Sequence, residues 1–448
     1  MQIPSISPAP NIGCSQQPPT MVRNLAQTFD MLTHAAETQL GLITESASPW
    51  GTAFYLGDGL QRAVADRILD LFRPGTWIPA NIWRLSFGAL QQALRVSAFL
   101  DPCQAALAYQ ELKNKLEVFA LVKNLSSTLQ LPPDQLIPLP ELVRRAYRVS
   151  PFSALWAVEG LGHYYTDLYW KLKGAPHSLL SDSDVQVPQE SLLMLHAGMG
   201  LAFASRLLDS ISPDAASPNQ VSTVLREFVS LCENNARLGY LGAAIESLGL
   251  VTRDFYPDLL DIIHRQFVEI APQFIGFFWH GAGRALYFSR RYFLPLLGTV
   301  WSGIDEEAHG CPDRQSAMAG LAWAVTLVNM RQPAIMQNVL GSQMAPAPLA
   351  DAFTNGVISS IIMRQDTTPD AQFIPAFFKY QAHDRQRATI WERRISEPTT
   401  LALNTFYPAL RQHHALDQVF RYQDLAAVVS SLQLPGTGQS SEEPEYQH

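Results

Sequence analysis

The chain has 448 residues, 47% of them hydrophobic and 16% charged, and its 32 Lys and Arg against 40 Asp and Glu give a net charge of −8. A nucleic-acid partner is not expected, because phosphate binding needs a concentrated positive face and the basic residues are scattered singly or in pairs. The four cysteines lie far apart, which argues against a zinc ribbon or a disulfide framework and favours a reducing, cytoplasmic setting.

Both ends of the chain are predicted to be disordered tails, over residues 1–20 and 434–448, because Pro, Ser and polar residues dominate there. The first 20 residues contain no basic residue and no apolar core, so a signal peptide is not expected. The most apolar stretches, Leu192 to Leu208 and Phe274 to Phe288, are interrupted by His and Arg. We therefore expect no transmembrane segment, whereas peripheral membrane contact remains open.

A helical N-terminal region is predicted over residues 21–130. Its clearest element is an amphipathic helix from Asp101 to Ser127, whose Lys and Glu side is expected to face solvent. The Pro-rich stretch from Leu131 to Pro140 indicates a boundary. A helical repeat domain is predicted to follow over residues 140–433, because apolar residues recur there at three- and four-residue spacing.

One motif of small residues followed by an apolar helical run occurs six times in this second region. The copies are VEGLGHYY from Val158, HAGMGLAFA from His196, LGYLGAAIE from Leu238, WHGAGRALY from Trp279, MAGLAWAV from Met318 and TNGVISSII from Thr354. The equivalent positions are Gly162, Gly200, Gly242, Gly283, Ala322 and Ser359, which are separated by about 40 residues, the length of one helix-turn-helix unit.

Glycine destabilises a helix by about 1 kcal/mol relative to alanine, so its recurrence at one phase needs a compensating contact. A stripe of small residues allows a neighbouring helix to pack at short range. The sequence therefore predicts an all-α tandem helix-pair repeat array, either an open α-solenoid or a closed α/α toroid, with a helical N-terminal cap.

At VEGLG, HAGMGLAFA and WHGAGRALYF the sequence resembles a bacterial family of unknown function. Members of that family occur in enediyne-type natural-product gene clusters and carry EGxGM, GxGWALxRL and GxGRALWF-like segments in the same order. The resemblance covers about residues 140–370, and Ala322 and Ser359 stand where the pattern suggests glycine. It implies a role in bacterial specialised metabolism, and it brings no catalytic residues that can be carried over.

Several polar residues lie beside the small-residue motifs at a similar helical phase. We consider Glu159, His196 and His280 as candidates for proton transfer. The candidates for substrate binding are His163, Tyr164, Trp279, Arg284 and Asn355. The alternative is that these are hydrogen-bonded structural residues, which is the usual role of an isolated histidine on an apolar helix.

Two further pairs have the Glu-x-x-His spacing of di-iron sites or its Asp equivalent. They are Glu306 with His309 and Asp261 with His264. The other ligands that such a site needs cannot be named from the sequence, so no metal or other cofactor is predicted, and the pairs are interpreted as parts of solvated turns.

Two functions are compatible with these observations. The first is an accessory or interaction protein that binds a protein partner or a hydrophobic intermediate, which is favoured by the repeat and by the lack of a recognisable catalytic motif. The second is an enzyme that acts on a large apolar substrate, such as a polyene, isoprenoid or lipid-like molecule, in a helical cavity lined by the chain's many aromatic residues.

Overall fold

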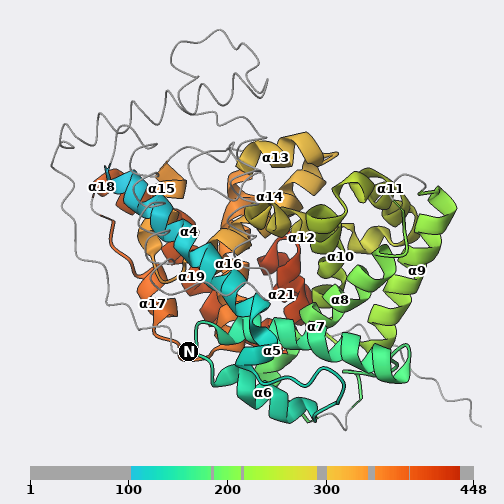
Figure 1. Ribbon diagram of the computed structural model, residues 1–448. Coiled ribbons are helices and arrows are strands. Elements are labelled where there is room, and N and C mark those ends of the chain that lie inside the picture. The colour runs from blue at the N-terminus through green and yellow to red at the C-terminus, as the bar shows by residue number, and fades with distance from the viewer. Residues whose placement is uncertain are drawn as a thin grey trace, which may run out of the picture.

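The computed structural model of the chain describes residues 102–182, 186–212, 216–289, 300–341, 349–382 and 384–433. These residues form helices and contain no β-strand, so the predicted all-α class is confirmed (Figure 1). The predicted tails, 1–20 and 434–448, lie outside the described residues, as does the predicted N-terminal region as far as Asp101.

Six helices occupy the centre of the described structure, and each packs on the next in the order α7, α8, α10, α12, α14 and α16. Their bounds are Ala154–Lys173, Leu192–Leu208, Leu241–Phe255, Ile275–Phe288, Cys311–Asn329 and Ala350–Thr367. They are the helices that carry the six small-residue motifs. Since α16 also contacts α7 and α8, the series ends beside the helices with which it begins.

Further helices lie between successive members of this central series. α9 (Pro218–Asn235) and α11 (Leu260–Ile270) pack on each other at the right-hand margin of Figure 1, outside α8, α10 and α12. α13 (Val300–Glu307) contacts α12 and α14, and α15 (Pro333–Gly341) contacts α14. From α8 onward, one further α-helix of the described residues thus lies between each central helix and the next.

The small residues lie where two central helices approach most closely. A Cβ atom at Gly162 would stand 2.5 Å from the backbone oxygen of Leu195 in α8, and one at Gly200 would overlap the backbone oxygen of Ala244 in α10. A Cβ atom at Gly283 would likewise overlap the backbone of Ala317 in α14. The predicted short-range helix packing is therefore present at these positions, and it offsets the cost of glycine in a helix.

The Gly-x-Gly spacing has a geometric explanation. Residues two apart on an α-helix point about 200° apart, so they face opposite neighbours. In α8, Gly198 lies against α7 and Gly200 against α10. In α12, Gly281 lies against α10 and Gly283 against α14. A helix packed between two others at short range therefore needs one small residue on each side.

The helix that was predicted from Asp101 to Ser127 is present as α4 (Pro102–Lys123), followed by α5 (Leu125–Thr128). α4 crosses the front of the molecule in Figure 1 and contacts α7, α14 and α15. The expectation that its charged side faces solvent is wrong for Lys115, which is buried with its ammonium 3.8 Å from the ring centroid of Tyr287. Contact with the central helices covers that side of α4.

Two prolines shape the long C-terminal helix. After α17 (Phe373–Phe378), helices α18, α19 and α20 follow each other without a break, with π-helical turns at Glu392–Ser396 and Ala402–Phe406 between them. Their bounds are Arg385–Trp391, Glu397–Leu401 and Tyr407–Gln412. Each π turn ends two residues before a proline, Pro398 or Pro408. Proline lacks the N–H group and collides with the carbonyl four residues earlier, and a wider turn relieves that collision.

The segment after this helix packs against the central series. A 3-10 helix, Leu416–Phe420, contacts α10, α12 and α16 and precedes α21 (Leu425–Gln433). The side chain of Asp417 accepts a hydrogen bond from the backbone N–H of Gly242 at 2.9 Å. Phe420 is fully buried, with its ring centroid 5.8 Å from that of Trp323. This segment therefore covers buried side chains of the central helices α12 and α14.

One helical stretch, Gln189–Leu208, is long and apolar enough to cross a membrane by length and composition. Within the structure, however, 83% of its most apolar window is buried, as expected for the core helix of a soluble protein. The described residues therefore contain no clear transmembrane segment.

Candidate functional site

Four charged or titratable side chains meet in the interior, and we call them the buried charge cluster: Glu159 of α7, Glu246 of α10, and His280 and Arg284 of α12. The guanidinium of Arg284 donates to Glu159 and, at 3.3 Å, to Glu246. Nδ1 of His280 lies 3.1 Å from the other oxygen of Glu246. His280 and Arg284 are four residues apart, so one face of α12 presents both.

The buried charge cluster is sealed from solvent. Glu246 and His280 are 0% exposed, Arg284 is 4% exposed and Glu159 is 6% exposed. The indole ring of Trp323 in α14 covers the guanidinium of Arg284 at 4.6 Å. The ring of Phe420 closes on His280 from the C-terminal segment, with the ring centroids 6.1 Å apart.

The cluster contains two carboxylates and one guanidinium, so its formal charge is −1 when His280 is neutral. Burial raises the pKa of Glu159 even though Arg284 opposes that effect. Burial likewise lowers the pKa of His280, against the pull of Glu246. Burial acts to lower the pKa of Arg284, but the two carboxylates outweigh it and raise that pKa. Burial thus disfavours the charged form of Glu159, whereas Arg284 keeps its charge.

Three nitrogen atoms in or beside the cluster have no hydrogen-bond partner. They are Nε2 of His280, Nε of Arg284 and Nε1 of Trp323. An unpartnered polar atom in the interior is costly and calls for an explanation. The cluster therefore has the composition of a proton-transfer site, but its burial leaves no route by which a substrate reaches the carboxylates in this conformation.

Of the eight site residues predicted from the sequence, the structure brings Glu159, His280 and Arg284 together in this cluster. Glu246 completes it and was missed. The signal was present, because Glu246 is the acidic residue within an otherwise uncharged apolar run, from Leu241 to Val251, as Glu159 is within its own helix.

His196 is not part of the cluster, and both of its ring nitrogens are engaged elsewhere. Nδ1 lies 2.7 Å from the backbone oxygen of Leu192, and Nε2 accepts the backbone N–H of Arg237 at 3.0 Å. The ring stacks on Tyr240 with the centroids 5.1 Å apart. Burial lowers the pKa of His196 to about 4, so it is neutral near pH 7. This arrangement fits the structural alternative for the residue.

Three of the predicted binding residues also lie apart from one another. His163 is half-buried in α7, and burial lowers its pKa although Asp167 opposes that effect. The hydroxyl of Tyr164 donates to the backbone oxygen of Pro132. The amide of Asn355 in α16 donates to the backbone oxygen of Gln423 at 2.8 Å, whereas its own oxygen has no partner.

Trp279 points away from the cluster toward a partly exposed group on α11 and the loop before α14. Its indole N–H donates to Nδ1 of His264 at 3.1 Å. The imidazole of His264 stacks on that of His309 with the centroids 4.3 Å apart, and His309 lies 3.1 Å from a carboxylate oxygen of Asp261. The structure thus brings the histidines of the two sequence pairs together, with Asp261 beside His309. Among the described side chains, no group of three or more His, Cys, Asp or Glu has the geometry to hold a metal ion.

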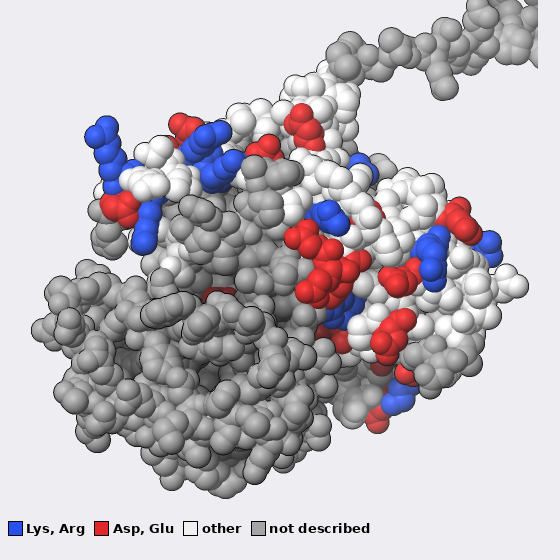
Figure 2. Space-filling view, turned by 90° about the horizontal axis from the view of Figure 1, so that it is seen from above, with Lys and Arg blue, Asp and Glu red and all other residues white. Residues whose placement is uncertain are grey.

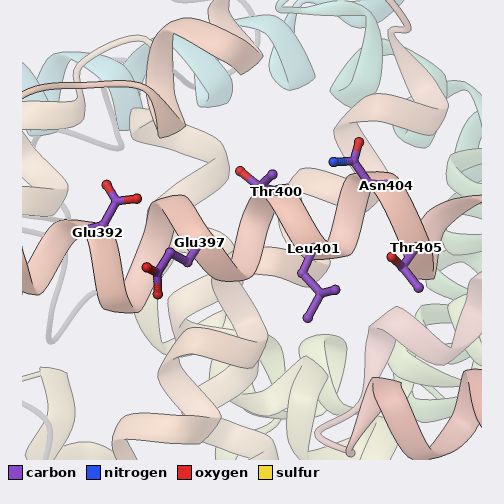
Figure 3. Close-up of a pocket in the computed structure, with 6 residues that line it drawn as sticks. All are labelled: Glu392, Glu397, Thr400, Leu401, Asn404 and Thr405. Carbon is purple, nitrogen blue, oxygen red and sulfur yellow. The ribbon is translucent and has the colours of Figure 1, made fainter.

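One hollow of the described structure lies on the surface and not beside the cluster. It is a groove of about 460 Å³ along the π-bulged C-terminal helix, lined by Glu392, Glu397, Thr400, Leu401, Asn404 and Thr405 (Figure 3). None of these was among the predicted site residues. Elsewhere, Lys and Arg side chains alternate with Asp and Glu over the described surface that is visible in Figure 2.

Comparison of the chain with models of known families, with curated proteins and with solved structures finds no match.

Proposed function

We propose that this protein is an accessory or interaction protein of helical-repeat type in bacterial specialised metabolism, which binds a protein partner or a hydrophobic intermediate. The observation that carries the proposal is the sealing of the buried charge cluster. Glu159 and His280 are two of the three candidates for proton transfer, yet both are at most 6% exposed and both are paired within the cluster. A buried ionic network of this kind fixes the arrangement of the helices that contribute to it.

We further propose that the central helices form a closed toroid of repeated helix pairs. Support comes from the contact of α16 with α7 and α8, and from the recurrence of small residues at each central contact. Arg284 bridges Glu159 of α7 and Glu246 of α10, which is the arrangement expected of a group that faces the interior of such a ring. A protein partner would then bind the outer surface, where the groove of Figure 3 lies.

The test is complementation of a strain that lacks the gene, with metabolites followed by mass spectrometry. His280→Gln keeps a hydrogen-bonding group beside Glu246 but removes the imidazole, and its folding is checked by thermal unfolding. An accessory protein retains its function in this variant. The proposal is wrong if the folded variant accumulates an intermediate that purified wild-type protein converts without help.

A further inference from the structure

Arg364 of α16 is a buried cation without an acceptor. Its side chain is 0% exposed, and none of Nε, Nη1 and Nη2 has a hydrogen-bond partner among the residues that the structure describes. Arg284 provides the comparison within the same molecule, because it is equally buried but is held by two carboxylates. Buried charges in proteins are normally paired, so the bare guanidinium of Arg364 requires a partner that the described residues do not supply.

Three aromatic rings surround this guanidinium. The distances from Cζ of Arg364 to the ring centroids are 4.7 Å for Phe152, 4.7 Å for Trp156 and 5.3 Å for Phe373. The rings also contact each other, with centroids 5.0 Å apart for Phe152 and Trp156 and 5.5 Å apart for Phe152 and Phe373. Cation–π contacts stabilise the charge, but a ring offers no lone pair to the five N–H donors of a guanidinium.

A second guanidinium strengthens the positive field at this place. Arg331 lies on the ring of Phe152, with Cζ 3.7 Å from the centroid. Arg331 has a partner of its own, since it donates to Glu117 at 2.7 Å in a half-exposed pair. Burial lowers the pKa of Arg364 to about 9, and Arg331 contributes in the same direction, so Arg364 remains charged near neutral pH. The interior therefore carries an uncompensated positive charge in an aromatic setting.

We propose that Arg364 anchors an internal binding site for the carboxylate of an apolar organic acid. The planar carboxylate matches the fork of guanidinium donors, and the cage of Phe152, Trp156 and Phe373 suits an apolar body attached to it. A monoanion balances the single unpaired charge. Phe373 and Arg331 are the partly exposed members of the group, so entry takes place on their side and requires Phe373 to move.

The site rests on the proposed function, which includes binding of a hydrophobic intermediate. It adds the chemical class of that ligand, an apolar carboxylic acid. The experiment measures binding of octanoate and benzoate to the full-length protein by calorimetry and by the shift in melting temperature, with inorganic phosphate and octanol as probes that lack either the apolar body or the carboxylate. We expect the two acids to bind and to stabilise the protein, and phosphate and octanol to do neither.

The decisive variant is Arg364→Met, which keeps an unbranched apolar stem and removes the charge of the side chain. We expect it to weaken octanoate binding by about 10- to 100-fold, as the loss of a charge-assisted hydrogen-bond pair does. Without ligand it should melt at or above the wild-type temperature, because a bare buried charge has been removed. The matched control is Arg284→Met, which removes an equally buried guanidinium and should leave octanoate affinity within about threefold of wild type at a temperature where it remains folded.

Two results would overturn the proposal. The first is that neither acid binds the wild-type protein, or that Arg364→Met binds both as tightly. The second is that Arg364→Met melts well below the wild type in the absence of ligand, which would mean that the guanidinium is already paired within the chain. Both results leave the complementation test unaffected, so failure of this site and failure of the proposed function can be told apart.

Discussion

Arg284 binds Glu159 across 125 residues of sequence and joins α12 to α7, which are not neighbours in the central series. The same guanidinium also donates to Glu246, so a single side chain pairs with carboxylates from two other helices. We expect Arg284→Met to lower the free energy of unfolding by about 3–5 kcal/mol, because it leaves two buried carboxylates without a counter-charge. Chemical denaturation at pH 7 measures the change.

The control for that prediction is a pair on the surface. Arg206 donates to Asp167 at 3.0 Å, and both side chains are more than 40% exposed. Arg206→Met is expected to change stability by no more than about 1 kcal/mol, since water screens an exposed pair. Equal losses in the two variants would contradict the importance that we give to the buried charge cluster.

Removal of one carboxylate should be milder than removal of the guanidinium. In Glu159→Gln the amide oxygen can still accept from Arg284, and the cluster becomes formally neutral because Glu246 remains. Burial already raises the pKa of Glu159, so the charged carboxylate is not fully stabilised by its surroundings. We expect a loss below about 2 kcal/mol in the same denaturation assay. A loss as large as that of Arg284→Met would show that the charge of Glu159, and not that of the guanidinium, determines how much the cluster contributes to the free energy of unfolding.

Close helix packing gives a sharp prediction at Gly200. A Cβ atom there would overlap the backbone oxygen of Ala244, and neither backbone can move away without disturbing the contact of α8 with α10. We expect Gly200→Ala to destabilise the protein by about 1–3 kcal/mol, the usual cost of overpacking. Gly276→Ala is the matched control, because the nearest atom to a Cβ at Gly276 is 3.6 Å away. The control variant should be neutral or slightly more stable than wild type, as measured by the melting temperature.

The sequence was informative where local periodicity controls the structure. Helical class and the spacing of small residues follow from patterns a few residues long, and these patterns correctly indicated Gly162, Gly200 and Gly283 as contact positions. The charged residues Glu159 and Arg284 were predicted as site residues because they lie beside the small-residue motifs at a similar helical phase. The helical periodicity and the position of polar residues beside the small-residue motifs can be read from the sequence because each depends on a short stretch of one helix.

What the sequence could not provide were properties that depend on loops and on distant segments. Trp279 precedes His280 directly, but the two side chains point about 100° apart on the helix and reach different clusters. His196 has a phase similar to that of His280, yet the loop before α10 brings the backbone N–H of Arg237 to its ring. The closing of the interior by Phe420 depends on a segment some 140 residues further along the chain.

Loss of the hydrogen bond at Asp417 should affect only the residues around it. Its carboxylate accepts the backbone N–H of Gly242 in the first turn of α10, where a negative group is favourable. Its own backbone N–H donates to the carbonyl of Gly239 at 3.1 Å. Asp417→Ala is expected to cost about 1–2 kcal/mol and to raise amide hydrogen exchange in residues 415–421 and in the first turn of α10. Asp417→Asn keeps an acceptor and should show a smaller increase, whereas an increase spread over all central helices would argue against a local role.

The two hydrogen bonds of His196 lead to a prediction for acid stability. The pKa of this histidine is about 4 in the folded protein, mainly because of burial, against about 6.5 for an exposed histidine. A lowered pKa means that the unfolded chain takes up a proton before the folded protein does. The resulting stability is therefore fully present above pH 6.5 and is lost as the pH falls from 6.5 toward 4. The difference corresponds to about 3 kcal/mol over that range.

His196→Gln removes the titrating group and keeps a side chain that can both donate and accept a hydrogen bond. We expect this variant to be less stable than wild type at pH 7 and to have a flatter stability profile between pH 6.5 and 4, as measured by denaturant unfolding at several pH values. His264→Gln is the comparison, because the pKa of His264 is also lowered to about 4 but its surroundings are only half-buried, which reduces the effect on stability. Parallel profiles for wild type and His196→Gln would show that the pKa of this imidazole is the same in the folded and the unfolded chain, and that burial does not lower it.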